Sequence, residues 1–79
     1  MEHHHDYSSM QETLLEETTA LLDYIVHHNQ AHAQELKEVA MPVKDSRQAC
    51  FQKIEGALAL FEQANHELEE ALSLLREGK

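Results

Sequence analysis

The sequence contains very few of the residues that interrupt secondary structure. One proline and two glycines occur among 79 residues, tryptophan is absent, and aromatic residues make up 5%. Because turns depend on proline and glycine, this scarcity predicts a few long elements. A chain of this length forms one domain at most, and it leaves much of its apolar surface exposed unless a partner covers it.

Cysteine is almost absent as well. Cys50 is the single cysteine, so no disulfide can form within the chain, and a lone thiol indicates a reducing compartment. Residues 1–6 lack the apolar segment of an export signal, and no apolar run is long enough to span a bilayer. We therefore expect a cytoplasmic protein that has no membrane partner.

Basic residues are outnumbered by acidic ones. Six Lys and Arg residues stand against 15 Asp and Glu residues, which gives a formal net charge of −9. Nucleic acids attract clustered Lys and Arg, so this balance argues against a nucleic-acid partner. No phosphate-binding loop, Cys-x-x-Cys motif or Ser–His–acid arrangement occurs, and two helices can hardly enclose a substrate pocket. The sequence therefore predicts that the chain is not an enzyme.

The residues that are present predict an all-α fold that begins with a long helix. Ser9 and Glu12 form a capping box, which predicts a helix over about 10–41. Residues 1–8 are expected to form a disordered N-terminal arm. Pro42 ends the helix, because the residue before a proline is steered away from helical angles.

A second helix of similar length follows a short loop at residues 42–45. A second capping box starts at Asp45 and predicts a helix over about 46–77, which Gly78 ends. Equal lengths and a short connection predict an antiparallel two-helix hairpin over residues 9–79. In this hairpin, residue i is expected to face about residue 87 − i.

Apolar residues at helical spacing form one seam on the second helix and two on the first. The second-helix seam is Cys50, Ile54, Ala57, Phe61, Ala64, Leu68, Ala71 and Leu75, and Phe51, Leu58 and Leu72 widen it. The first-helix seams are Leu14, Leu21, Ile25 and Val39, and beside them Leu15, Leu22, Val26, Ala33, Leu36 and Ala40. The two seams of the first helix span roughly 140°, which is wider than one partner helix buries. We therefore expect either a homodimer that forms a four-helix bundle or docking on another helical protein. Cys50 is expected in the core.

Polar residues interrupt the apolar arc of the first helix near its middle. Asn29 and His32 lie inside the arc, and His28 lies on its flank. Buried polar groups need hydrogen-bond partners. One interpretation is a buried polar layer of Asn29, His32 and Asn65 that fixes the register, as a core Asn does in coiled coils. The facing rule puts Asn65 near Leu22, so the two asparagines are expected to meet only between two copies. The favoured alternative is that Asn65 is a second register device or a partly wet position.

The alternative interpretation of the same turn is a metal site. His28 and His32 lie four residues apart on one helical face, and imidazole binds zinc, copper, nickel and cobalt. Glu35 lies on the same ridge and adds an oxygen ligand in this interpretation. The facing rule brings Glu55 near His32.

A separate metal site is predicted at the N-terminus. His3 is the third residue from a free amine, and an amine, two amides and an imidazole form a square-planar set that suits copper(II) or nickel(II). The alternative is a solvated tail or the remnant of a cloning tag.

The segment Tyr24–Leu36 carries the pattern His-Asn-x-x-His-Ala-x-x-Leu, and the second half of the chain contains an Ala64-Asn65 pair. In both features the chain resembles small uncharacterised helical-hairpin proteins of bacteria and archaea. That family has no settled function. The resemblance therefore implies the hairpin fold and a matching role for His28, Asn29 and His32.

Two functions remain open from the sequence. The first is a non-catalytic helical interaction or oligomerisation module that dimerises or docks on another helical protein. The alternative is a small cytoplasmic metal-binding accessory protein that uses the helical histidines to hold nickel, cobalt, copper or zinc. No other cofactor is expected.

Overall fold

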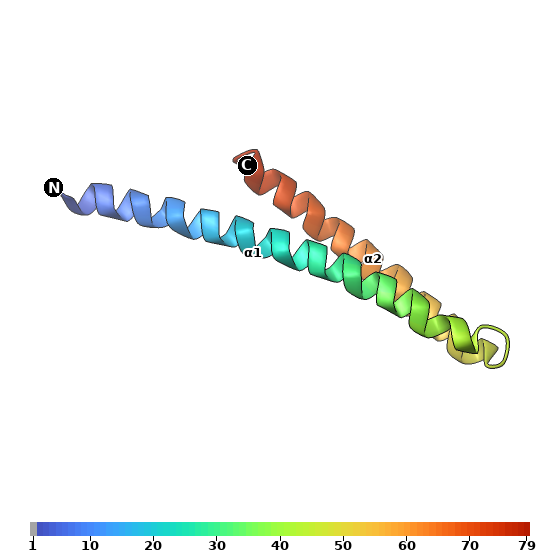
Figure 1. Cartoon of the computed structure of the whole chain (residues 1–79). Coiled ribbons are helices and arrows are strands. Elements are labelled where there is room, and N and C mark those ends of the chain that lie inside the picture. The colour runs from blue at the N-terminus through green and yellow to red at the C-terminus, as the bar shows by residue number, and fades with distance from the viewer. Residues whose placement is uncertain (1) are drawn as a thin grey trace.

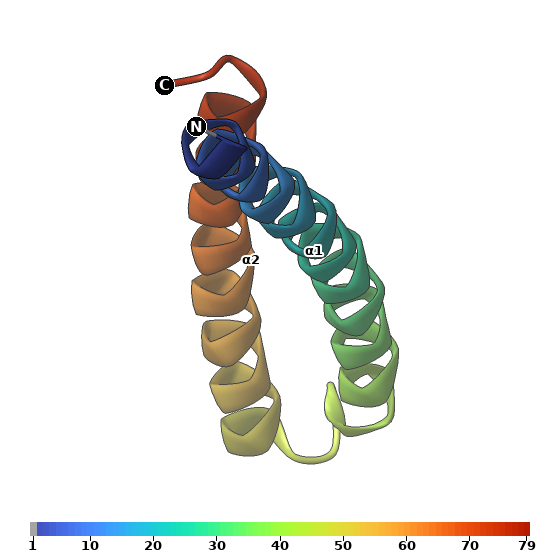
Figure 2. The same cartoon turned by 90° about the vertical axis from the view of Figure 1, so that its left-hand side faces the viewer.

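The chain forms two long helices that pack side by side in opposite directions (Figures 1 and 2). The computed structural model describes the backbone of residues 2–79 and the side chains of residues 9–79. The elements in order are α1 (Glu2–Ala40), the short 3₁₀ helix η1 (Met41–Val43) and α2 (Gln48–Arg76), with no strand in the described chain. The prediction of an all-α hairpin is confirmed. None of the described helices combines the length and the apolar character needed to cross a membrane.

The structure starts α1 earlier than the sequence predicted. α1 begins at Glu2, where a disordered arm over residues 1–8 was expected. No proline or glycine precedes Pro42, so each residue can add one hydrogen bond to a helix that has already nucleated. Ser9 consequently lies inside α1, and its capping box does not mark the start of the helix.

The chain reverses later than the sequence predicted. Pro42 lies in the first turn of η1, where its missing N–H is tolerated. The Lys44 amide donates to the Met41 carbonyl at 3.2 Å, and the Arg47 amide donates to the Val43 carbonyl at 3.0 Å. These turns continue the direction of α1 until Arg47, whose backbone angles (φ −140°, ψ 68°) lie outside the helical region. Pro42 therefore ends α1 without reversing the chain.

The ends of α2 differ in how they are capped. Arg47 is the N-cap residue and makes no side-chain cap hydrogen bond, so the capping box predicted at Asp45 does not form. At the other end Gly78 adopts a left-handed φ of 77°. The Lys79 amide donates to the Leu74 carbonyl at 2.9 Å, and the Gly78 amide donates to the Leu75 carbonyl at 3.1 Å. This pair of bonds is a Schellman motif, and it confirms Gly78 as the end of α2.

The seam of α2 that packs on α1 matches the predicted one in part. The buried or half-buried residues of α2 are Phe51, Ile54, Leu58, Phe61, Asn65, Leu68, Glu69, Ala71, Leu72 and Leu75. Cys50, Ala57 and Ala64 are exposed, so the prediction that Cys50 lies in the core is wrong. Phe and Leu carry more apolar surface than Cys and Ala, so burying the larger side chains gains more hydrophobic free energy. On α1, the buried apolar residues are Val26, Ala33 and Ala40.

The register between the helices also differs from the prediction. Asn29 faces Asn65, with 3.0 Å between their side-chain amide groups, whereas the predicted facing position was about residue 58. The shift is about seven residues, or one heptad, which leaves the same helical faces in contact. It follows from the late reversal at Arg47, because η1 and the turn after it lengthen the first arm of the hairpin.

Candidate functional site

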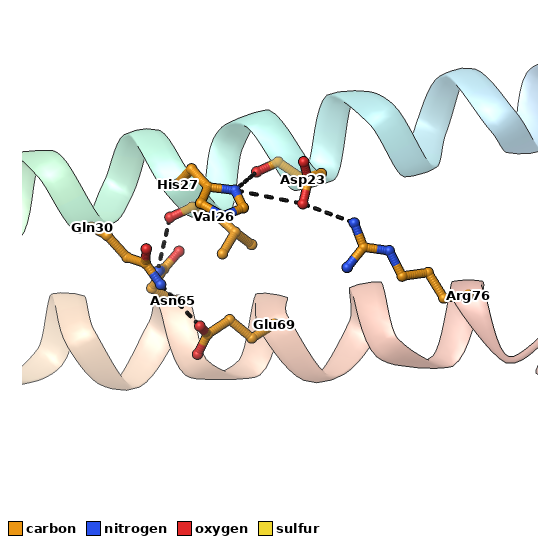
Figure 3. Close-up of polar contacts among 7 residues, drawn as sticks. All are labelled: Asp23, Val26, His27, Gln30, Asn65, Glu69 and Arg76. Atoms are coloured by element: carbon orange, nitrogen blue, oxygen red, sulfur yellow. Dashed lines mark hydrogen bonds and ion pairs between the residues drawn. The ribbon is translucent and has the colours of Figure 1, made fainter.

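A buried pair of asparagines joins the two helices. Asn65 is 7% exposed, and its Oδ1 accepts a hydrogen bond from Asn29 Nδ2 at 3.0 Å. Asn65 Nδ2 donates to the Val26 carbonyl at 3.2 Å (Figure 3). No buried side-chain nitrogen or oxygen among the described residues lacks a partner. The two asparagines expected to meet only between copies therefore meet within one chain.

The structure leaves His32 outside this layer. Its side chain is 51% exposed, although the sequence placed it in the polar core with Asn29. Three residues turn an α-helix by about 300°, so His32 lies roughly 60° away from Asn29 around the α1 axis. That rotation is enough to move the imidazole from the packed seam onto the open flank of α1.

His28 and His32 form a close pair on that flank. Their Nε2 atoms lie 2.9 Å apart, and their rings meet edge to face with centroids 4.3 Å apart. Tyr24 stacks on His28 with ring centroids 5.3 Å apart, which restrains that imidazole. Glu35 Oε1 lies 3.1 Å from His32 Nδ1, where the carboxylate can accept a hydrogen bond from this ring nitrogen and fix the ring orientation. The pair is therefore oriented from both sides.

The separation of the two Nε2 atoms suits a shared metal ion. Metal–imidazole bonds of about 2.0–2.1 Å place two adjacent ligand nitrogens about 2.9–3.3 Å apart, depending on the angle at the metal. However, no group of three or more His, Cys, Asp or Glu side chains in residues 9–79 is placed to hold an ion. One chain therefore offers two nitrogen ligands at this point and no complete set.

Two other predicted ligands do not join this pair. Glu55, expected near His32, lies at the loop end of the hairpin, where it lines a groove with Lys37 and Phe51. The heptad shift in register accounts for this difference. His3 lies outside the residues whose side chains the structure describes.

Polar contacts connect α1 to α2 along one edge of the hairpin. They join Asp23 Oδ1 to Arg76 Nη2 at 2.9 Å, Gln30 Nε2 to Glu69 Oε2 at 3.1 Å, and Lys37 Nζ to Glu62 Oε2 at 3.4 Å. Figure 3 shows the first two of these contacts beside the buried asparagine. Among the described residues, both ion pairs that link α1 to α2 lie on this edge. We call it the polar edge.

The opposite edge carries the second apolar seam of α1, and no side chain of residues 9–79 covers it. Each residue turns the helix by about 100°, so Ile25 and His32 fall on one side of the buried line and Asp23 and Gln30 fall on the other. The α1 stripe, as we call this surface, consists of Leu14, Leu21, Ile25, His28, His32 and Val39. Its four apolar members are 55%, 62%, 42% and 63% exposed, in chain order. The stripe holds no charged residue, and the histidine pair lies within it.

Shallow grooves between the helices are other features with mixed chemistry. The groove beside the asparagine pair measures about 240 Å³, below the roughly 300–1,000 Å³ of usual ligand pockets. A groove of about 480 Å³ lies on the polar edge, but its lining, which includes Asp23, His27 and Arg76, is mostly polar and charged, whereas ligand pockets are lined mainly by apolar side chains. The open α1 stripe is therefore the better candidate for a functional surface.

The comparison with protein families gives one match. The family model described as "Domain of unknown function (DUF8180)" matches residues 18–75. That range contains the packed parts of both helices, the asparagine pair and both histidines of the stripe. No curated protein and no solved structure matches the chain.

Proposed function

We propose that this chain, which belongs to the DUF8180 family of domains of unknown function, is a non-catalytic helical module that assembles with a second copy of itself through the α1 stripe. One observation carries the proposal: a single hairpin leaves the four apolar side chains of the α1 stripe 42–63% exposed to water.

The exposed area is large for a chain of this mass. The chain exposes 6453 Å², whereas a folded monomer of 9.1 kDa is expected to expose about 4,900 Å². The excess is about 1,500 Å², and a standard interface buries about 800 Å² on each partner. One additional contact of ordinary size therefore removes about half of the excess.

The shape of the hairpin explains why it cannot bury this surface alone. Its extents are 69 × 17 × 14 Å, and its radius of gyration is 19.0 Å, where a compact chain of this length has about 12 Å. The N-terminal part of α1 extends past the end of α2 (Figure 1). Four apolar side chains are buried among the described residues: Val26, Ala33, Ala40 and Leu72. Such a small core gives marginal stability unless another helix pair completes it.

A second copy fits the stripe because four of its six residues are placed symmetrically about Gln30, whereas Ile25 and Leu14 lie opposite Glu35 and Ser46 of the second copy. Leu21 and Val39 lie equally far from Gln30 in the sequence, and so do His28 and His32. A two-fold contact needs a surface that is complementary to itself, and this spacing supplies one for two antiparallel α1 helices. The lack of charge in the stripe also lets two chains of net charge −9 approach each other there.

Sedimentation equilibrium tests the proposal. The wild-type chain at micromolar concentration, without added metal, should show about twice its own mass. Leu21→Glu places a charge in the stripe and should shift the protein to monomer, because a buried unpaired carboxylate is costly. Leu74→Glu is the matched control: Leu74 is 49% exposed on the outer face of α2, and its substitution should leave the dimer intact.

Three outcomes would contradict the proposal. A wild-type monomer would show that the stripe stays uncovered in solution. A Leu21→Glu dimer would place the contact elsewhere. Equal loss of the dimer in the Leu74→Glu protein would remove the argument that the stripe is the contact surface.

A further inference from the structure

We infer that two paired α1 stripes form a transition-metal site, in which His28 and His32 of each copy supply four imidazole nitrogens; this inference rests on the proposed self-association. The first step is the local geometry. The two Nε2 atoms of one chain are 2.9 Å apart and share a hydrogen bond. Two neighbouring nitrogens bound to one ion have about the same separation, so a metal ion can replace the shared proton without moving the rings far.

The second step is the orientation of the rings. Glu35 Oε1 lies 3.1 Å from Nδ1 of His32, so the carboxylate can hold that nitrogen in its protonated form. Histidine ligands usually donate their second ring N–H to a carboxylate or carbonyl in this way, and the partner fixes which nitrogen faces the metal. Tyr24 packs on His28 and limits its rotation. Glu35 is therefore a positioning residue for the site.

The third step is the missing half of the ligand set. Closed zinc sites use four protein ligands, and residues 9–79 of one chain gather no group of three or more candidate ligands. Residues 9–79 of one chain therefore do not complete such a site, and a second copy supplies a second histidine pair. In an antiparallel contact centred on Gln30, His28 of one copy faces His32 of the second copy, and the four imidazoles converge.

The same register encloses the site with apolar side chains. Leu21 of one copy faces Val39 of the second copy, and the two-fold axis repeats that contact at the other end of the histidine cluster. Each of these contacts lies seven residues, or about 10 Å, from the nearest histidine and bounds the cluster at one end. Four neutral nitrogen ligands favour zinc, copper, nickel or cobalt over magnesium or calcium, which prefer oxygen. The acidic dimer also attracts a divalent cation.

Zinc binding measured by equilibrium dialysis, together with sedimentation of the same samples, tests the inference. All proteins carry His3→Ala, His4→Ala and His5→Ala, so that N-terminal imidazoles cannot contribute. The parent protein should bind one zinc ion for every two chains. The His28→Ala/His32→Ala variant should lose this binding, and His27→Ala should keep it, because His27 lies on the polar edge beside Asp23.

A conservative variant tests the positioning residue. Glu35→Gln should weaken zinc binding by about 10- to 100-fold, the usual effect of removing an outer partner of a metal-bound histidine. The stoichiometry of one zinc to two chains should stay the same. Unchanged affinity in Glu35→Gln would show that the carboxylate does not orient His32 for a metal.

The two measurements separate failure of the metal site from failure of the proposed assembly. A parent dimer that takes up no zinc, or one zinc per chain, overturns the shared site and leaves self-association standing. A monomer that takes up no zinc overturns both. A protein that is monomeric without zinc and dimeric with half a zinc per chain supports the site and makes the assembly dependent on the metal.

Discussion

At the scale of single residues, the asparagine pair fixes the position of α2 along α1. Apolar seams with a heptad repeat can slide by seven residues and still match. Such a slip would bring Asn65 opposite Leu22 or Leu36, where neither side chain can hydrogen-bond with it. An unpaired buried amide costs about 1–3 kcal/mol. The pair between Asn29 and Asn65 therefore favours the observed register over its heptad neighbours.

Single and double substitutions of this pair should behave differently. Asn29→Leu removes the donor to Asn65 Oδ1 and should lower the free energy of unfolding by about 1–3 kcal/mol. Asn29→Leu/Asn65→Leu removes both partners and should restore or raise stability, because an apolar pair leaves no unmet hydrogen bond. Urea unfolding at one fixed protein concentration measures both changes.

An exposed amide one turn further along α1 serves as the control for this pair. Gln34→Leu should change stability by less than about 0.5 kcal/mol, as surface substitutions usually do. If the double variant is as unstable as Asn29→Leu, the amides make contacts that leucine cannot replace, and the argument about register fails.

At the scale of the helices, the sequence predicted the number and type of the elements but not their offset. Long apolar periodicity and the lack of proline and glycine are enough to predict two helices. Pro42 showed only where α1 cannot continue, because a proline fits equally well at the start of η1. The position of the reversal, at Arg47, depends on turn hydrogen bonds that leave no clear mark in the sequence.

Because the offset between the helices could not be predicted, only some residues of the candidate site could be placed from the sequence. His28, His32 and Glu35 lie close together because they are neighbours on one helix, and helical spacing alone predicted this. Contacts across the hairpin depend on the offset, so the partners of Asn65 and Glu55 were placed one heptad away. The choice between the Cys50 and Phe51 lines of α2 depended on side-chain size, a signal that the heptad pattern ignores.

Replacing each glycine by alanine should have opposite effects at the two positions. Gly56 lies inside α2, and nothing lies within 4 Å of an added Cβ, so Gly56→Ala should stabilise the helix by about 1 kcal/mol. Gly78 has a φ of 77°, and Gly78→Ala should cost about 1–2 kcal/mol because a Cβ disfavours left-handed angles. Thermal melts monitored by circular dichroism compare the two proteins directly.

The comparison depends on whether each substitution raises or lowers the melting temperature, and less on the size of the change. Equal shifts for both alanine variants would indicate that α2 frays before its last turn, so that the Schellman motif contributes nothing. A destabilised Gly56→Ala protein would instead mean that the open space at this position is filled by a second copy in solution.

At the scale of the whole molecule, the net charge opposes association of two copies, and the exposed apolar area favours it. Each chain carries a formal charge of −9, so two copies repel over distances up to about a Debye length. The ion pairs on the polar edge are exposed, and such pairs contribute about 0–1 kcal/mol each. Burial of the α1 stripe has to outweigh the repulsion, because the polar edge adds little.

This balance predicts how the melting temperature depends on concentration and salt. If folding and association are linked, the melting temperature should rise with protein concentration, because mass action favours the associated form. Added sodium chloride should raise it further, because screening weakens the repulsion between 15 acidic residues per chain more than it weakens a few exposed ion pairs. The Leu21→Glu protein should lose the concentration dependence, since its stripe no longer associates.

Melts in a chelating buffer, across a range of protein concentrations and at low and high salt, measure both effects without any contribution from metal. A melting temperature independent of concentration in the wild type would mean that the hairpin unfolds as a monomer. A melting temperature that falls with salt would mean that the ion pairs on the polar edge stabilise the fold more than the net charge destabilises it.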